Sequence, residues 1–351
     1  MKRCMNCCVP DTVPNITFNP EGVCSFCRSY KAPEILGEDA LMAIVGPVKR
    51  ADSRYDCIVP LSGGRDSSYI LYMAKAVYGL KVLAVNYDSE FRTDQALVNM
   101  RNACAALDVD FVSVHSKRNI ARKLVLNSIR SSLPQGLSWN CGDVCRACMY
   151  GCRSVAYKKA EEHEVPLILW GESSAEATQD MERAAMAGLT ISRMRKLLDI
   201  SFYKAECCAL LQRIEFRVSG NSVWPRRSIP VLKRPGTKEI RFFDYIQWDR
   251  KRIKEAITTE IGWKAPDGSI STWRTDCSLH HLINYCYLRV LGCTKDCFGY
   301  TKMICGGQMT RDEALRQELR MVASLAERVE EVLEEIGLAR EEIEKVTSWD
   351  F

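Results

Sequence analysis

Short apolar runs alternate with amphipathic stretches through the middle of the chain. The apolar runs are bounded by turn residues and predict buried strands at 55–61, 81–87, 110–115, 166–170 and 240–246. The amphipathic stretches predict helices at 67–78, 94–107, 118–130, 141–164, 250–261 and 279–291. Strands that alternate with helices are typical of a parallel sheet covered by helices, so we expect an α/β fold with a doubly wound parallel sheet.

The two ends of the chain depart from this alternation. Residues 1–30 are irregular, with Pro, Asn, Gly and several cysteines. Residues 310–346 are rich in Glu, Arg and Leu and predict long helices with a break at Gly337. We therefore expect an N-terminal segment (1–30), a linker helix (31–54), an α/β domain (55–262) and a helical C-terminal region (263–351).

Composition narrows the classes of protein further. The chain has 351 residues, with 49 Lys and Arg against 44 Asp and Glu, so its net charge of +5 is too small to predict a nucleic-acid or membrane binder. No apolar run reaches the ~18 residues of a membrane span, and the first residues lack the apolar region of a secretory signal. Eighteen cysteines without an export signal favour metal or redox chemistry over disulfides, and a cytoplasmic location.

The sequence LSGGRDSS at 61–68 lies between the first predicted strand and the first predicted helix. Two glycines let a backbone approach an anion closely, and the following helix offers free N–H groups and the positive end of its dipole. The serine hydroxyls add donors, and Asp66 can hold Mg²⁺ or cap the helix. The alternative is a simple Gly-Gly turn with a helix cap, and the sequence is not a Walker loop.

This stretch resembles the SGGxDS motif of the PP-loop ATPases, which grips the pyrophosphate of ATP. The resemblance implies adenylation of an oxygen, with ATP and Mg²⁺ as cofactors. For the catalytic roles we expect Asp66 and Glu172. The expected nucleotide-binding residues are Ser62, Gly63, Gly64, Arg65, Asp66, Ser67, Ser68 and Asp88. Asp88 also fits a solvated turn, and Glu172 also fits the start of a helix.

Two groups of cysteines have metal-ligand spacing. Cys4-x2-Cys7 and Cys24-x2-Cys27 are sixteen residues apart, which is the spacing of a structural Zn²⁺ site, so we expect residues 1–30 to form a zinc-ribbon-like segment, although four unrelated thiols remain an alternative. Cysteines 141, 145, 148 and 152 fall on one stripe of a helix, which suits either a buried apolar face or a metal site. For the metal site we expect Cys145, Cys148 and Cys277 as ligands, with Cys293, Cys297 and Cys305 as other candidates for the third position, and a [4Fe-4S] cluster as one occupant.

Stretches along nearly the whole chain resemble one branch of the PP-loop ATPases, the N-acetyl sugar amidotransferases of lipopolysaccharide and flagellar-glycan biosynthesis. The matching stretches include CMNCCVPDTVPNITFNPEGVCSFC, YDCIVPLSGGRDSSYILYMAK, PLILWGES, WRTDCSLHHL and GGQMTRDEAL. The resemblance implies that ATP adenylates the acetamido oxygen of an N-acetyl sugar and that ammonia then displaces AMP to leave an acetamidino group. It also implies a separate ammonia-supplying pair, a glutaminase and a cyclase-like protein. Arg65 stands where that family usually has Lys.

Two other functions fit parts of the sequence. A tRNA-thiolating enzyme of the same superfamily would use the N-terminal cysteines to hold RNA and a metal or iron–sulfur site on the central cysteines. We do not expect nucleic acid as a partner, because no dense basic patch is interleaved with aromatic residues. A non-enzymatic zinc-ribbon protein is the third possibility, and the intact SGGRDSS argues against it.

Overall fold

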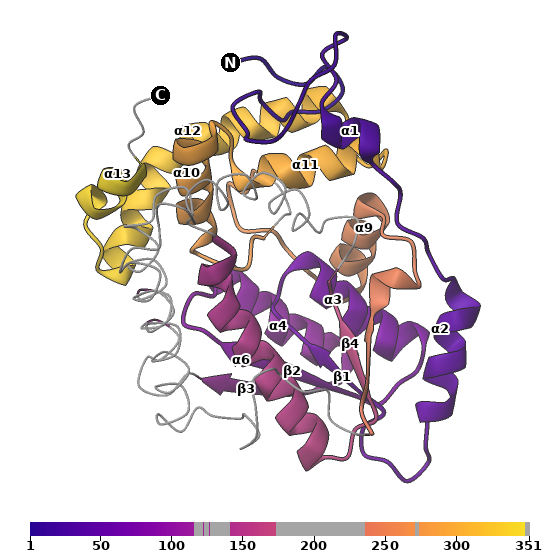
Figure 1. The fold of residues 1–351 in the computed structure, drawn as a ribbon. Helices are drawn as coiled ribbons and strands as arrows, with labels where there is room; N and C mark the ends of the chain where they lie inside the picture. The colour runs from indigo at the N-terminus through magenta and orange to yellow at the C-terminus, as the bar shows by residue number, and fades with distance from the viewer. Residues whose placement is uncertain (116–121, 123–125, 127–140, 173–235, 271–273, 348–351) are drawn as a thin grey trace, which may run out of the picture.

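The computed structural model describes residues 1–115, 122, 126, 141–172, 236–270 and 274–347. Figure 1 shows a sheet in the lower half of the molecule, with the N-terminal segment lying against the last helices at the top. The helix predicted at 118–130, apart from residues 122 and 126, lies outside the described residues, and so do residues 173–235.

The sheet is parallel throughout and has the strand order β3-β2-β1-β4-β5. The central strand β1 pairs with β2 on one side and β4 on the other, and Cys57 is in register with both Val82 and Leu167. The strands are β1 (Cys57–Pro60), β2 (Val82–Asp88), β3 (Asp110–His115), β4 (Leu167–Trp170) and β5 (Lys238–Arg241). The α/β class predicted from the sequence is confirmed. The last strand starts and ends earlier than predicted, because Phe242–Asp244 turn into a 3₁₀-helix.

Helices cover both faces of this sheet, as Figure 1 shows. Alternate strand residues point to opposite faces, so Ile58 packs into one apolar core while its neighbour Val59 packs into the other. Helices α3 (Arg65–Tyr72), α4 (Asp94–Leu107) and α9 (Arg250–Ile261) pack together on the Val59 face. Helix α6 (Cys141–Glu162) covers the Ile58 face.

The N-terminal segment packs against the C-terminal helices. The segment contains α1 (Ser25–Ser29) and is followed by α2 (Glu38–Val45). The C-terminal helices are α10 (His280–Leu291), α11 (Lys295–Cys305), α12 (Arg311–Ile336) and α13 (Arg340–Thr347). Gly337 adopts a φ of +71° and ends α12, as the sequence predicts.

Contacts between the two ends of the chain are specific. The Arg311 guanidinium donates from Nε to the carbonyl oxygens of Cys4 and Cys7, at 2.9 and 3.0 Å. The Thr12 hydroxyl donates to the Leu291 carbonyl at 2.6 Å. The N-terminal segment therefore forms one body with α10, α11 and α12.

Candidate functional site

The residues between β1 and α3 form a tight turn, here called the glycine loop (residues 61–64). It leaves the carboxyl edge of the sheet where the strand order reverses, with β2 on one side of β1 and β4 on the other. Open α/β sheets bind ligands in the crevice at this point. Gly63 has a φ of +78°, and a Cβ added there would lie 2.2 Å from the carbonyl oxygen of Ala96. Only glycine fits this position.

Serine hydroxyls fix the shape of the loop. The hydroxyls of Ser62 and Ser67 are 3.1 Å apart, and the backbone N–H of Gly64 donates to Ser62 Oγ at 3.3 Å. Ser67 Oγ in turn donates to the Gly64 carbonyl at 3.2 Å. The hydroxyl of Ser68 is buried and has no hydrogen-bond partner among the described residues. The loop therefore brings hydroxyls and the N-terminus of α3 to one place, which is what a phosphate group requires.

Residues that are distant in sequence fix the glycine loop through hydrogen bonds to its backbone. The carbonyl oxygen of Gly63 accepts hydrogen bonds from Trp263 Nε1 at 3.0 Å and from Asn99 Nδ2 at 3.3 Å. Asn99 also bonds to the backbone of Lys264. Sequence reasoning missed Trp263 and Asn99, because no local pattern relates them to the loop.

Arg65 and Asp66 pair with each other at the start of α3. The Arg65 guanidinium, 4% exposed, donates to both Asp66 oxygens at 2.8 and 3.1 Å. It also lies over the ring of Trp248, whose Nε1 donates to Asp66 Oδ1 at 3.4 Å. The N-cap of α3 is Gly64, so Asp66 does not cap the helix. The predicted contacts of Arg65 with phosphate and of Asp66 with Mg²⁺ stay predictions.

The other two predicted carboxylates lie at the same edge of the sheet and have partners. Asp88, the last residue of β2, accepts from the backbone of Glu90 at 2.9 Å and contacts His115 Nδ1 at 2.8 Å. Glu172 follows β4 and accepts from Arg153 at 2.9 Å. Their roles with nucleotide and substrate stay predictions.

A carboxylate that the sequence did not single out lies directly against the glycine loop. A Cβ added at Gly64 would be 3.3 Å from the carboxyl carbon of Asp276. Asp276 also accepts from Arg92 Nη1 at 3.0 Å. A carboxylate beside a phosphate-binding turn is a suitable Mg²⁺ ligand. In the sequence TDCSLHH this carboxylate directly precedes the candidate metal ligand Cys277.

Three of the predicted metal-binding thiols lie together beside Asp276, here called the central thiols (Cys145, Cys148 and Cys277). Burial and the nearby charge of Cys145 together raise the pKa of the Cys148 thiol to about 12. Burial and the other two thiols also raise the pKa of Cys277. Burial lowers the pKa of Arg92, but Asp276 and the neighbouring thiols raise it above its usual value. Cys148 and Cys277 therefore lie near the charge of Arg92. The three thiols are not among the described groups whose ligand atoms lie close enough together to hold a metal, and metal binding here stays a prediction.

The other candidates for the third ligand lie elsewhere. Cys297 is 3.2 Å from Cys8, sulfur to sulfur, in the contact between the N-terminal segment and α11. Cys293 adjoins Cys297, and Cys305 adjoins Cys27. Of the four thiols weighed for that position, Cys277 is the one that neighbours Cys145 and Cys148.

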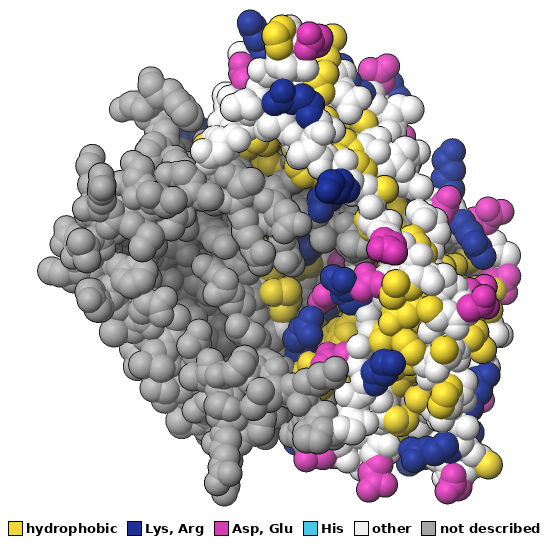
Figure 2. Space-filling view, turned by 45° about the vertical axis from the view of Figure 1, so that its right-hand side comes forward, with side chains coloured by type: hydrophobic (Ala, Val, Ile, Leu, Met, Phe, Trp, Pro, Cys, Tyr) yellow, Lys and Arg dark blue, Asp and Glu magenta, His cyan; other side chains and the backbone are white. Residues whose placement is uncertain are grey.

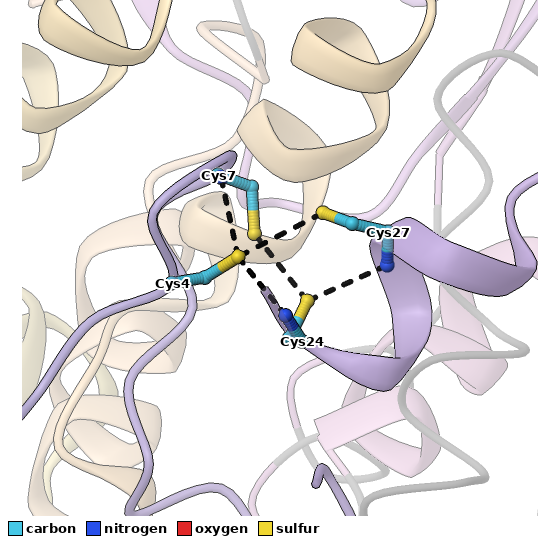
Figure 3. A group of neighbouring side chains, drawn as sticks. All are labelled: Cys4, Cys7, Cys24 and Cys27. Atoms are coloured by element: carbon cyan, nitrogen blue, oxygen red, sulfur yellow. Dashed lines mark hydrogen bonds between the residues drawn. The ribbon is translucent and has the colours of Figure 1, made fainter. Parts of the chain in front are cut away.

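The N-terminal cysteines come together as their spacing predicts. Figure 3 shows the side chains of Cys4, Cys7, Cys24 and Cys27 pointing toward one another, here called the four-cysteine group. All four sulfurs lie within 4.8 Å of one another, and it is the one such group among the described residues. The Cys7–Cys24 sulfur distance of 3.7 Å matches the edge of ~3.8 Å expected for a tetrahedron with Zn–S bonds of ~2.3 Å.

Backbone amides of the four-cysteine group donate hydrogen bonds to its sulfur atoms. The N–H groups of Cys7 and Cys24 donate to the Cys4 sulfur at 3.4 and 3.2 Å, and that of Cys27 donates to the Cys24 sulfur at 3.4 Å. Such bonds stabilise thiolates and orient them as ligands. The donor set and its geometry fit a structural zinc ion.

A cavity of about 360 Å³ lies between α9 and α12. Arg250, Lys251 and Lys254 line it from α9, and Glu313 and Gln317 line it from α12. Arg250 pairs with Glu313 at 2.8 Å, while the two lysines form no ion pair with a described residue. The buried Oε1 of Gln317 also has no hydrogen-bond partner among the described residues. The cavity therefore offers positive charge from the two lysines.

Figure 2 shows positive and negative side chains interspersed over the described part of one face, with no broad patch of a single sign there. None of the described helices combines the length and apolarity needed to span a bilayer. Comparison with protein-family models and with curated proteins finds no match for this chain.

Proposed function

We propose that this protein is an ATP-dependent amidotransferase that adenylates the acetamido oxygen of an N-acetylated sugar. The observation that supports ATP binding is the glycine loop. Gly63 in this loop has a positive φ, the Ser62 and Ser67 hydroxyls are hydrogen-bonded to each other, and the loop lies where the strand order reverses. The proposal that the acceptor is an N-acetyl sugar rests on the resemblance of the sequence to the N-acetyl sugar amidotransferases.

The reaction needs positioning and charge stabilisation rather than a protein nucleophile. The acetamido oxygen attacks the α-phosphorus of ATP, and the bond to the bridging oxygen breaks to release pyrophosphate. Ammonia then adds to the activated carbon, and AMP leaves with the former acetamido oxygen. In the first step the loop N–H groups and the Ser62 and Ser67 hydroxyls hold the departing pyrophosphate, where negative charge accumulates.

Mg²⁺ would neutralise charge on the phosphates when bound. Asp276 is the carboxylate in contact with the loop, and Asp66 is the one that begins α3. Each of the two carboxylates is paired with an arginine, Asp66 with Arg65 and Asp276 with Arg92, so either would hold the ion with one arginine beside it. Ammonia would come from a separate glutaminase and cyclase-like pair, as the resemblance implies.

The cavity between α9 and α12 suits the charged part of the acceptor. The cavity is connected to the glycine loop through one short stretch of chain. Arg250, which lines the cavity, is two residues from Trp248, and Trp248 donates a hydrogen bond to Asp66 beside the loop. The lysines would bind a phosphate or carboxylate of the sugar. This favours a nucleotide-linked or acidic N-acetyl sugar.

The deciding experiment is AMP formation from ATP and ammonium by anaerobically purified protein. Nucleotide-linked N-acetyl sugars, free N-acetylated acidic sugars and bulk tRNA are assayed in parallel as acceptors. We expect AMP in proportion to one of the sugars, with formation of an amidine detected by mass spectrometry. AMP formation that depends on tRNA alone would overturn the sugar assignment.

A double variant that removes both lysines of the cavity tests the acceptor site within the same assay. Lys251→Ala/Lys254→Ala is expected to raise the KM for the sugar about tenfold, since a hydrogen bond to a charged group contributes ~1.5–3 kcal/mol. The KM for ATP should stay unchanged. Lys158→Ala on α6, which removes an equally exposed lysine paired with Glu162, is the matched control. An unchanged sugar KM in the double variant would exclude the cavity as the acceptor site.

A second function is favoured by one observation, the central thiols beside Asp276 and the glycine loop. In a tRNA-thiolating enzyme, a cluster on these thiols would deliver sulfur to an adenylated base. Iron and sulfide reconstitution under anaerobic conditions is then expected to give a visible absorption band that Cys277→Ala abolishes. Cys286→Ala, which removes a buried thiol of α10, should leave the band intact. No band in the unmodified protein would remove this alternative.

A further inference from the structure

A fifth thiol lies against the four-cysteine group. The sulfur of Cys305, the last residue of α11, is 3.6 Å from that of Cys27. The distance from Cys27 to Cys4, within the group itself, is longer at 4.0 Å. By separation alone, Cys305 is as much a neighbour of Cys27 as the other ligands are.

The position of Cys305 is set by firm contacts. The backbone N–H of Gly306 donates to the Lys302 carbonyl at 2.8 Å and closes α11 directly after Cys305. The N-terminal segment is held on the same side by Arg311, which bonds to the carbonyls of Cys4 and Cys7. The closeness of the two thiols therefore follows from the packing of two anchored elements.

Cys27 is the ligand best suited to exchange. Cys4, Cys7 and Cys24 are fully buried, whereas Cys27 and Cys305 are both half-buried. A half-buried side chain can leave a metal and reach water without disturbing the core. Zinc in a structural site takes four ligands, and its d¹⁰ shell imposes no directional preference that would distinguish one thiolate from another.

We propose that Cys305 is an alternative zinc ligand that replaces Cys27, so that five thiols serve four coordination positions. In the exchange the Cys305 thiol loses its proton to solvent and bonds to zinc, while the Cys27–zinc bond breaks and Cys27 takes up a proton. The ion keeps four thiolates, and no oxidant or reductant is needed. With Cys305 bound, zinc joins the N-terminal segment directly to α11. This second ligand set is independent of any nucleotide chemistry.

The test is the metal content and cobalt spectrum of full-length variants. Cys27→Ala is expected to retain one zinc per chain after dialysis, and so is Cys305→Ala. Cys27→Ala/Cys305→Ala is expected to lose zinc or to hold it in a site open to chelator. In cobalt-substituted protein, each single variant keeps the thiolate-to-cobalt band of the parent, and the double variant loses about one quarter of it, since one of four thiolates is gone.

The outcomes separate the two ligand arrangements. A Cys27→Ala protein that loses zinc, or one whose cobalt band falls by about a quarter as in the double variant, overturns the proposal. The cobalt band distinguishes Cys305 from water in the fourth position, which zinc content alone does not. Cys104→Ala removes a buried thiol of α4, away from the four-cysteine group, and serves as the control for the number of cysteines.

Discussion

Gly63→Ala is expected to abolish ATP binding. The added Cβ would lie 2.2 Å from the Ala96 carbonyl oxygen, and the φ of +78° would also be strained by ~1–2 kcal/mol. The loop must then move away from α4, which takes its N–H groups and serine hydroxyls out of register with a phosphate. A hydrogen bond to a charged group contributes ~1.5–3 kcal/mol, so the loss of two or more is expected to weaken binding at least ~100-fold by calorimetry with Mg²⁺–ATP.

Gly79→Ala is the matched control for this substitution. Gly79 has a φ of +62°, so alanine there meets similar backbone strain, but its Cβ would lie in open space. The control should be slightly destabilised and should bind ATP normally. If Gly63→Ala also unfolds at the assay temperature, Ser67→Ala addresses the same site without a clash. Normal ATP binding by Ser67→Ala and Gly63→Ala together would show that the glycine loop does not bind the nucleotide.

Removal of Cys7 is expected to release the zinc from the N-terminal segment. Cys7 is fully buried, and the extra thiol of Cys305 lies against Cys27, at 3.6 Å, so it is placed to replace Cys27 and not Cys7. The neighbouring thiol of Cys8 lies against Cys297 instead. Structural zinc contributes ~10–16 kcal/mol of apparent binding free energy in small zinc-folded domains. Cys7→Ala should therefore contain no zinc after dialysis, and residues 1–30 should become sensitive to limited proteolysis.

The buried thiol of Cys286 offers the comparison for that experiment. Cys286 lies in α10, and Cys286→Ala removes as much buried sulfur without touching the four-cysteine group. It should keep one zinc and a protected N-terminal segment. Full zinc content in Cys7→Ala would mean that the metal site is not the one proposed. Chelator treatment of the unmodified protein should reproduce the protease sensitivity of Cys7→Ala.

Local patterns were enough to predict much of the sheet and its helices. The apolar run at 110–115 and the amphipathic stretches at 94–107 and 250–261 match β3, α4 and α9 as observed. The period of their apolar residues predicts these elements, and N-cap residues such as Thr93 and Asp249 mark the helix starts. Helix α11 was missed, because its sequence KDCFGYTKMIC mixes charged and apolar residues and the fold buries both kinds, so no polar face marks it as a helix.

The candidate site was predictable only where its residues are adjacent in sequence. The spacing of the four N-terminal cysteines and the SGGRDSS stretch both carry their own signal. The contacts of Asp276 with the loop, and of Trp263 and Asn99 with the Gly63 carbonyl, join residues that are far apart in sequence. Such contacts arise only from tertiary packing, and no local pattern in a single sequence predicts them. Pairing of Arg65 with Asp66 was equally open, since neighbours on a helix usually point apart.

The docking of the N-terminal segment on the C-terminal helices has a consequence for synthesis of the chain. The carbonyls of Cys4 and Cys7 find their donor in Arg311, and Thr12 finds its acceptor in Leu291, so these bonds wait until nearly three hundred further residues have left the ribosome. At ~5–20 residues per second, that interval is tens of seconds. Early capture of zinc by the four cysteines would give the nascent segment a fold of its own during this interval and protect its thiols from oxidation and misplaced pairing.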